Sequence, residues 1–161
     1  MLDEIDLKIL AMLQTDCKVP QVELARSVGL SPASISERVK RLEKNGAIRG
    51  YAAILDPGVL DVGITAFVSV FVEHPRDEED FKSRLDALPE VQECHHITGD
   101  FSFLLKVRTK TTETFERLLI HDINSIPGVK RTKTIIVMSS LKEATQIPLE
   151  VSNSEQPEEI S

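Results

Sequence analysis

The spacing of small and apolar side chains between positions 24 and 35 restricts the fold of this 161-residue sequence more than any other feature. The residues concerned are Leu24, Ala25, Val28, Gly29, Leu30 and Ile35. They match the helix-turn-helix pattern, in which Ala25 is small where two helices cross and Gly29 permits a tight turn. Ser31-Pro32 supplies an N-cap followed by a proline at the first helical position. The sequence therefore predicts a helix-turn-helix whose second helix begins at Pro32, preceded by another helix with Asp3 as its N-cap.

The charges are divided unevenly along the chain, whose formal net charge is −7. Residues 1–50 contain 8 basic and 7 acidic side chains, whereas residues 51–161 contain 11 basic and 19 acidic ones. A basic patch on a short segment joined to an acidic body is one electrostatic footprint of a DNA-binding protein. A solvated amphipathic helix explains the same charges, so the charge distribution alone does not decide between the two interpretations.

One flank of the second helix of the motif is the predicted DNA-contacting surface. Its apolar residues point inward, which places Ser34, Arg38 and Arg41 on one flank at 100° per residue. An arginine can form a fork of hydrogen bonds with guanine, and a lysine neutralises a phosphate charge. Ser31 acts either as a cap alone or as a cap that also contacts phosphate. The predicted DNA-contacting residues are Ser31, Ser34, Arg38, Lys40, Arg41, Lys44 and Arg49.

The rest of the chain alternates predicted strands and helices. Strands are expected at residues 64–73, 91–98, 101–107 and 130–138, and helices at 78–88 and 112–126. The order βαββαβ predicts a ferredoxin-like sheet with both helices on one face, so the chain belongs to the α+β class. The expected boundaries are 1–50 for a winged-helix-like helix-turn-helix domain, 51–62 for a linker, 63–141 for the βαββαβ domain and 142–161 for a polar extension that is largely a disordered tail.

The face of the predicted sheet opposite the helices also requires a cover. Apolar residues lie on alternate sides of the strands at several positions: Val68, Val70, Leu104, Ile135 and Val137. A sheet that is apolar on both faces predicts pairing with a second copy of the chain. A twofold dimer also presents two helix-turn-helix motifs to a palindromic DNA site.

Eight short motifs occur in order along residues 2–141. They are Leu2-Asp-x-x-Asp6-x-x-Ile9-Leu10, Val28-Gly-Leu-Ser31, Glu37-Arg-Val-x-Arg-Leu42-Glu43, Gly46-x-Ile48-x-Gly50-Tyr51, Cys94-His95, Gly99-Asp100-Phe101, Leu104-Leu105-Lys106 and Pro127-Gly128-Val129. Together with the order of the two domains, they make the chain resemble the Lrp/AsnC (leucine-responsive, feast/famine) transcriptional regulators. This resemblance implies a sequence-specific DNA-binding regulator of amino-acid or nitrogen metabolism genes. It also implies a homodimer that assembles into tetramers or octamers, and an effector, usually an amino acid, bound between dimers near Gly99.

By the same resemblance, the effector-binding residues of the 63–141 domain are Thr98, Gly99, Asp100, Phe101, Ser102, Thr132 and Thr134. Backbone N–H groups around a glycine turn can bind an α-carboxylate, and the Asp100 carboxylate can bind an α-ammonium group. From spacing alone, Gly99-Asp100 is a β-hairpin turn, and only the resemblance makes it a binding loop. Many relatives have a second acidic residue where this chain has Ser102, which weakens the case for ammonium recognition.

An enzyme and an RNA-binding module are the alternatives from other classes. The similar sirohaem decarboxylases use a dense His/Tyr/Arg/Asn/Trp stretch, whereas this chain has no tryptophan and one tyrosine. His95 and His96 would point to opposite faces of a strand, so no metal, other cofactor or catalytic residue is predicted. An RNA-recognition motif needs exposed aromatic residues flanked by basic ones, which the acidic C-terminal part lacks. A sensor or assembly module with a vestigial DNA-binding domain stays open.

The cellular location follows from hydrophobicity and cysteine content. No stretch approaches the roughly 18 apolar residues of a membrane span, and the acidic start lacks a signal-peptide pattern. Cys17 and Cys94 are far apart and are expected to be buried thiols in a reducing compartment. These features predict a cytoplasmic protein without a membrane partner. The sequence leaves the effector, the operator, the direction of regulation, the subunit number and the target genes open.

Overall fold

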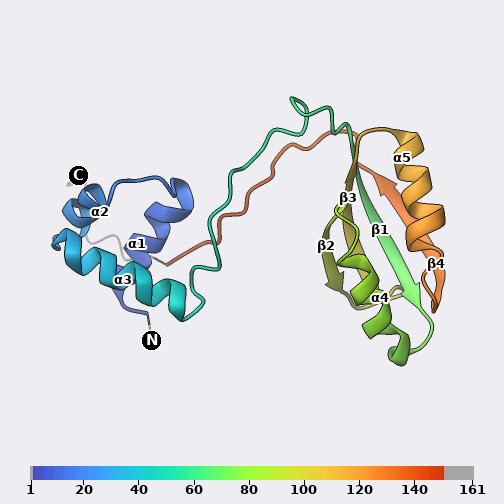
Figure 1. Ribbon diagram of the computed structural model, residues 1–161, viewed down its shortest axis with the longest axis horizontal. Helices are drawn as coiled ribbons and strands as arrows, with labels where there is room; N and C mark the ends of the chain where they lie inside the picture. Colours follow the sequence, from blue (N-terminus) through green and yellow to red (C-terminus); the bar gives the residue numbers. More distant parts are fainter. Residues whose placement is uncertain (1, 151–161) are drawn as a thin grey trace, which may run out of the picture. The chain divides into compact units, whose positions relative to one another are not determined.

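The computed structural model describes residues 2–150, which form two compact units (Figure 1). Residues 2–54 and 143–150 make up the helical unit, and Leu55–Lys142 make up the sheet unit. The helical unit contains α1 (Glu4–Thr15), α2 (Gln21–Val28) and α3 (Pro32–Lys44). The sheet unit contains β1 (Ile64–Val72), a 3-10 turn η1 (Pro75–Asp77), α4 (Glu78–Leu85), β2 (Val91–His96), β3 (Phe103–Thr109), α5 (Thr112–Arg117), a π-helix η2 (Leu118–Ile123) and β4 (Val129–Ile136).

The ends of the first three helices are fixed by the residues that the sequence indicated. The Asp3 carboxylate accepts a hydrogen bond from Asp6 N at 2.8 Å, and Asp3 N donates to the Asp6 carboxylate at 3.2 Å, so α1 begins with a capping box. Gly29 ends α2 in the left-handed conformation with φ of 70°. Ser31 Oγ accepts a hydrogen bond from Ser34 N at 3.2 Å at the start of α3. The predicted helix-turn-helix boundaries are therefore confirmed.

The three helices bury one small apolar cluster. Its fully buried members are Ile9, Leu24, Ala25, Ile35 and Leu42. The small Ala25 is 3% exposed, as expected where α2 approaches a neighbouring helix closely. After α3 the chain continues to β1 without a further helix or strand among the described residues.

Residues 143–150 return to the helical unit after the sheet has been completed. The Gln14 side chain at the end of α1 donates to Ile147 O at 3.0 Å and accepts from Ile147 N at 3.0 Å. This amide therefore satisfies both backbone groups of one residue, as a neighbouring strand would. The sequence did not indicate this contact. For residues 151–161, the prediction of a disordered tail concerns a part of the chain outside the described residues.

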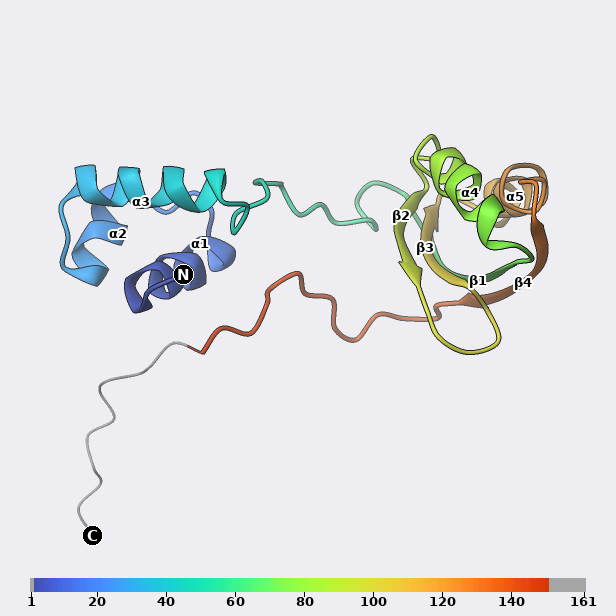
Figure 2. The ribbon, with the colours of Figure 1, turned by 90° about the horizontal axis from the view of Figure 1, so that it is seen from below.

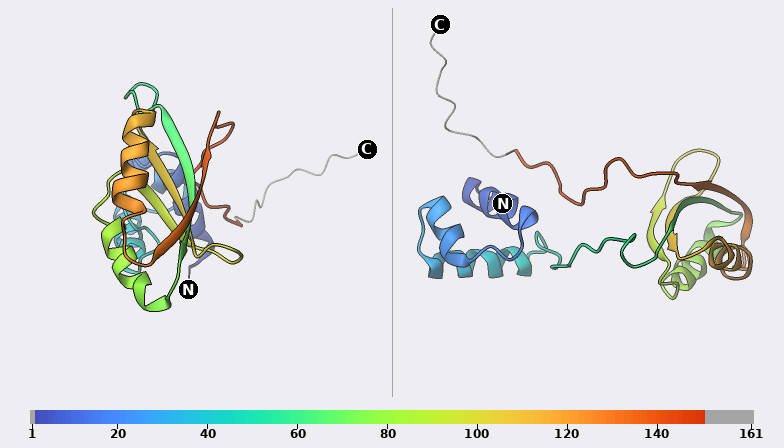
Figure 3. Two further views of the ribbon diagram at one scale, coloured as in Figure 1. Left: turned by 90° about the vertical axis from the view of Figure 1, so that its right-hand side faces the viewer. Right: turned by 90° about the horizontal axis from the view of Figure 1, so that it is seen from above.

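The four strands form one antiparallel sheet in the order β2-β3-β1-β4. Helices α4 and α5 both lie on one face of it (Figures 2 and 3). Within residues 55–142, no other helix covers the opposite face, which we call the open face. This is the βαββαβ arrangement that the sequence predicted. The register pairs Val68 of β1 with Leu105 of β3 and with Thr134 of β4. Because paired residues share a face, the register assigns each strand residue to the helix-covered or the open side.

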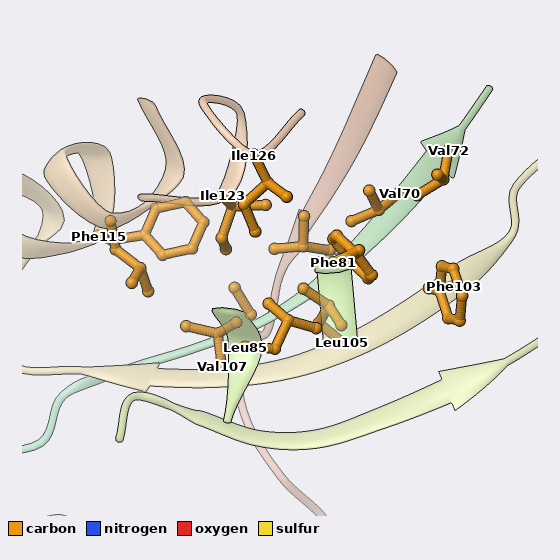
Figure 4. Close-up of a cluster of buried hydrophobic side chains, with 13 residues drawn as sticks. Val70, Val72, Phe81, Leu85, Phe103, Leu105, Val107, Phe115, Ile123 and Ile126 are labelled. Carbon is orange, nitrogen blue, oxygen red and sulfur yellow. The ribbon is translucent and has the colours of Figure 1, made fainter. Parts of the chain in front are cut away.

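The main core lies between the sheet and its two helices (Figure 4). Every second residue of β1 is buried, and Phe81 of α4 and Phe115 of α5 pack against them. The Phe81 and Phe103 ring centroids are 4.9 Å apart. Burying one large apolar side chain stabilises a fold by about 1.5–3 kcal/mol, so this cluster is the principal source of stability in the sheet unit.

Several sequence-based expectations about the sheet unit are wrong in detail. The helix expected over 112–126 is split, because Asn124 N donates to Leu119 O, a bond five residues back, and a π-helix replaces the last turns. The helix expected over 78–88 ends at Leu85. Cys94 of β2 is exposed rather than buried, and so is Cys17 of the helical unit.

The two faces of the sheet differ from the expected distribution of apolar residues. Val68 and Val70 both lie fully buried under the helices, so they do not contribute to the open face. Leu104 and Ile135 do belong to the open face, because they pair with Ser69 and Phe67 of β1. Ile135 is 52% exposed. The open face is therefore only partly apolar.

Candidate functional site

Helix α3 presents a mixed polar and basic surface. The first three turns of α3 and Leu30 just before the helix line an open hollow, which we call the α3 hollow. Its lining residues are Leu30, Ser34, Glu37, Arg38 and Arg41. The structure thus brings the predicted flank residues Ser34, Arg38 and Arg41 together. Lys40 and Lys44 are exposed elsewhere on the same helix, and Arg49 is exposed just beyond its end.

The two arginines of the α3 hollow are joined to α1 by a buried carboxylate. Arg38 Nη1 donates to Asp6 Oδ1 at 2.7 Å and to Asp3 Oδ2 at 2.6 Å. Arg41 Nη2 donates to both oxygens of Asp6, at 2.8 and 2.7 Å. The Asp6 side chain is 1% exposed, whereas those of Arg38 and Arg41 are 23% and 55% exposed. We call Asp3, Asp6, Arg38 and Arg41 the α1–α3 charge network.

The charge network perturbs the groups at its rim. The hydrogen bond from Arg38 lowers the pKa of Asp3 below its ordinary value. The hydrogen bonds to Asp3 and Asp6 raise the pKa of Arg38. Both shifts favour the charged forms, because each charge stabilises its partner. The sequence analysis missed Asp6 as a partner of the arginines, although a carboxylate on the apolar side of α1, between Ile5 and Ile9, was a signal that it needs one.

The remaining predicted DNA-contacting residues have simpler surroundings. Ser31 is exposed and caps α3, and its hydroxyl also forms a hydrogen bond of 2.9 Å with the hydroxyl of Ser34. The cap role of Ser31 is thus observed, and a phosphate contact stays a prediction. Just beyond Arg49, the Tyr51 hydroxyl donates to Glu43 at 2.9 Å, which fixes the chain as it leaves α3.

The loop between β2 and β3 contains most of the predicted effector-binding residues. Gly99 has φ of 112°, a conformation that a side chain would strain. Thr98 and Asp100 beside it are exposed. Ser102 closes the loop: its Oγ accepts from Val72 N at 3.2 Å, and its N–H donates to Val70 O at 2.9 Å. The Ser102 hydroxyl therefore serves the backbone of β1, beside the register shift between Phe71 and Val72.

An arginine that the sequence analysis did not single out lies against this loop. Arg131 of β4 donates to Asp100 O at 3.0 Å, and its guanidinium carbon is 4.6 Å from the centroid of the Phe101 ring. The same group lies 5.7 Å from the ring of Phe71. These contacts place Phe101 and Arg131 on the open face of the sheet. Position 131 precedes the predicted Thr132 by one residue, but no spacing rule indicated that it would meet the loop.

The predicted residues Thr132 and Thr134 are on the opposite face. They pair with the buried Val70 and Val68, so their side chains share the helix-covered side. Thr132 Oγ1 donates to Asn124 Oδ1 at 3.0 Å, just after the π-helix. The structure of one chain therefore does not bring the seven predicted effector-binding residues into a single cluster.

His95 and His96 point to opposite faces of β2, and the His96 ring stacks on Phe103 with centroids 5.0 Å apart. Within residues 2–150, no group of three or more His, Cys, Asp or Glu side chains is arranged to hold a metal ion. None of the helices in that range is long and apolar enough to cross a membrane.

Comparison with protein families gives matches to both parts of the chain. Residues 2–49 match the family described as winged helix-turn-helix DNA-binding, and residues 65–147 match the Lrp/AsnC ligand binding domain. A leucine-responsive regulatory protein of Klebsiella pneumoniae is 41% identical over 148 residues, which cover 91% of this chain and 90% of that protein.

Solved structures agree with these matches. A transcriptional regulator of Neisseria meningitidis in complex with L-Met has a TM-score of 0.88 and 33% identity, over 93% of this chain and 98% of that one. A feast or famine regulatory protein of M. tuberculosis complexed with L-methionine has a TM-score of 0.84 and 31% identity, over 91% of this chain and 99% of the other.

Proposed function

The chain belongs to the Lrp/AsnC family of DNA-binding transcriptional regulators, and we propose that it contacts duplex DNA through α3 and responds to an amino acid. The relatives are regulators rather than enzymes, so the activity is transcriptional regulation. We also propose a cytoplasmic location, because the relatives come from bacteria, whose DNA lies in the cytoplasm. Its target genes are proposed to serve amino-acid or nitrogen metabolism.

The observation that supports DNA contact through α3 is the gathering of polar and basic side chains on that helix. Ser34, Arg38 and Arg41 line the α3 hollow, and Lys40 and Lys44 extend the positive charge beside it. An arginine with free N–H groups can bind guanine in the major groove, and lysines bind phosphate without regard to sequence. Ser31 and Arg49 at the two ends of α3 complete the proposed contact surface.

Salt-dependent binding measurements test this surface. Lys40→Ala is expected to weaken binding to all duplexes alike and to reduce the slope of log K against log salt by about 1, because one phosphate contact is lost. The matched control is Lys82→Ala, which removes an exposed lysine from α4 in the sheet unit. Fluorescence anisotropy at several salt concentrations provides both slopes. Equal slopes for the two variants would place the DNA contact elsewhere.

The proposed effector site is the loop of residues 97–102 with Arg131. Two similar structures contain L-methionine, which supports an amino acid as the effector. The exposed Asp100 carboxylate is suited to an ammonium group, and the Arg131 guanidinium and the N–H groups near Gly99 are suited to a carboxylate. Thr98, Phe101 and Ser102 flank these groups in the loop. Thr132 and Thr134 stay part of the proposal only where a second copy completes the site.

Thermal unfolding against each of the twenty amino acids tests the effector proposal. A ligand at 100 times its Kd stabilises the protein by about 2.7 kcal/mol, which raises Tm by several degrees. Asp100→Asn is expected to abolish the shift, and Asp86→Asn, an equal charge change at the end of α4, is expected to leave it. No shift with any amino acid in the unchanged protein would contradict the proposal.

The open face of the sheet is the proposed dimer interface. Its apolar members include Phe67, Leu104 and Ile135, and a second copy would cover them while presenting a second α3 to a palindromic site. Ile135→Glu is expected to shift the protein to monomers in sedimentation experiments. Ile120→Glu is the matched control, because Ile120 is 48% exposed, close to the 52% of Ile135, but lies on the π-helix. A dimer that survives Ile135→Glu would contradict this interface. Tetramers or octamers are expected to form from such dimers.

A further inference from the structure

We propose that Asp6 is a positioning residue for DNA recognition, because its buried carboxylate holds Arg38 and Arg41 in the orientation in which they meet DNA. The proposal rests on the proposed role of these two arginines and adds the group that orients them. Asp6 itself is too deeply buried to touch DNA. Its effect on recognition is therefore transmitted through the guanidinium groups.

The geometry leaves most of each guanidinium available. Arg38 uses only Nη1 for Asp3 and Asp6, and Arg41 uses only Nη2 for Asp6. Each group thus keeps two of its three nitrogens for other contacts. The α3 hollow is lined by both side chains together with Ser34. One carboxylate consequently anchors two potential base-reading groups on the same surface.

Anchoring matters because arginine has a long side chain with many rotamers. A guanidinium held at one end loses less conformational freedom when it binds a base edge, so part of the ordering cost is met before DNA arrives. The anchor also opposes non-specific binding, since its negative charge offsets part of the positive charge that attracts phosphate. Loss of Asp6 is therefore expected to act in opposite directions on specific and non-specific binding.

One substitution at Asp6 removes the charge without removing the capping box of α1. Asp6→Asn removes the charge but keeps a side-chain oxygen that can accept the 3.2 Å hydrogen bond from Asp3 N, so the start of α1 is preserved. The matched control is Glu4→Gln, which makes the same charge change on the same helix. The Glu4 carboxylate instead pairs with Lys8 of α1 itself, at 3.1 Å.

The experiment measures two dissociation constants for the full chain by fluorescence anisotropy. The probes are a duplex selected by the unchanged protein from a randomised library and a shuffled duplex of the same base composition. The specificity ratio is the Kd for the shuffled duplex divided by the Kd for the selected duplex. For Asp6→Asn, this ratio is expected to fall about tenfold, which is the discrimination that one good base contact supplies. The Kd for the shuffled duplex is expected to stay the same or to decrease. Glu4→Gln is expected to leave the ratio unchanged.

A purely structural role for Asp6 would weaken binding to both duplexes in parallel, and that result would overturn the proposal. An unchanged ratio in a folded Asp6→Asn protein would also overturn it. If circular dichroism shows that Asp6→Asn does not fold, the same two dissociation constants are measured for Asp3→Asn instead. Asp3 is 49% exposed and contacts Arg38 but not Arg41, and an asparagine there keeps an oxygen for the capping hydrogen bond from Asp6 N. A smaller fall in the ratio is therefore expected, and an unchanged ratio overturns the proposal.

Arg38→Lys and Arg41→Lys separate this inference from the proposed DNA surface. Both keep the charge but lose the planar fork. If neither variant lowers the ratio of dissociation constants, the arginines do not read DNA and the surface itself is wrong. If they lower it while Asp6→Asn does not, the surface stands and only the positioning role of Asp6 is wrong.

Discussion

The sheet unit and the helical unit bury different kinds of side chain. In the sheet unit, Phe81, Leu105 and their neighbours form one large apolar cluster, and the buried Thr109 hydroxyl donates to a nearby carbonyl. In the helical unit, the apolar cluster is small, and Asp6 is as deeply buried as Ile9. The smaller unit therefore combines apolar packing with a charge network between α1 and α3.

This difference predicts which substitutions destabilise each unit. Apolar burial does not depend on the ionisation of side chains but is sensitive to lost volume, because a cavity is left behind. A buried carboxylate is sensitive to the loss of its partners, because an unpaired charge in the interior is costly. The sheet unit should thus respond most to truncation of large side chains, and the helical unit should also respond to removal of charge.

The largest effect is expected for Phe81→Ala, which removes a fully buried ring from the sheet unit. The free energy of unfolding of that unit should fall by about 3–5 kcal/mol. Chemical denaturation followed by amide exchange reports the two units separately. Ile120→Ala, at a position 48% exposed, is the control and should change stability by less than about 0.5 kcal/mol. Equal losses in both units would contradict the description of two separate apolar cores.

The second prediction concerns the charge network. Arg38→Ala combined with Arg41→Ala leaves the Asp6 carboxylate, 1% exposed, without a cationic partner, so the helical unit should lose about 3 kcal/mol of stability. Asp6→Ala should cost less, because the two arginines are partly exposed and can return to water. Urea denaturation gives both values. A larger loss for Asp6→Ala than for the double arginine variant would contradict this asymmetry.

A third prediction compares the N-caps of the two units. Ser31→Ala removes the cap of α3, and Thr111→Ala removes the cap of α5, so each should lower stability by about 1 kcal/mol. Thermal unfolding checks both values. Only Ser31→Ala is expected to weaken DNA binding, and Ser31→Thr, which keeps a capping hydroxyl, should restore stability. Equal effects of the two alanine variants on DNA affinity would remove Ser31 from the contact surface.

The smallest effect is expected from acid. Because the folded pKa of Asp3 lies below its ordinary 3.8, its contact with Arg38 stabilises the helical unit above that pH and is lost as pH falls through the lower folded value. The stability difference between the unchanged protein and Asp3→Asn should therefore be present at pH 6 and decrease steadily as the pH falls below 3.8. In the sheet unit, the hydrogen bond to His95 lowers the pKa of Glu93. The stability difference between the unchanged protein and Glu93→Gln should therefore also decrease as the pH falls.

Local signals in the sequence predicted much of this fold. Caps at Asp3 and Ser31 and the turn at Gly29 depend on neighbouring residues, so they were found correctly. The predicted order of strands and helices also follows from local periodicity, and the structure confirms it. The Lrp/AsnC resemblance inferred from the ordered motifs is confirmed by the family matches.

What the sequence did not indicate depends on contacts between distant positions. Arg38 and Arg41 meet Asp6 across more than thirty residues, and helical periodicity does not reveal the partner of a charged side chain. Arg131 meets the Gly99 loop through strand register, which spacing does not determine. The π-helix depends on how the residues after α5 fit against the sheet. The DNA-contacting and effector-binding assignments themselves stay predictions.

The return of residues 143–150 to α1 makes the helical unit discontinuous in sequence. During synthesis, α1, α2 and α3 leave the ribosome first, but Ile147, which pairs with Gln14, is made only after every strand of the sheet. The DNA-binding unit is therefore completed last, after its companion has had time to fold. A nascent chain that stalls before position 147 would present three helices without their final contact.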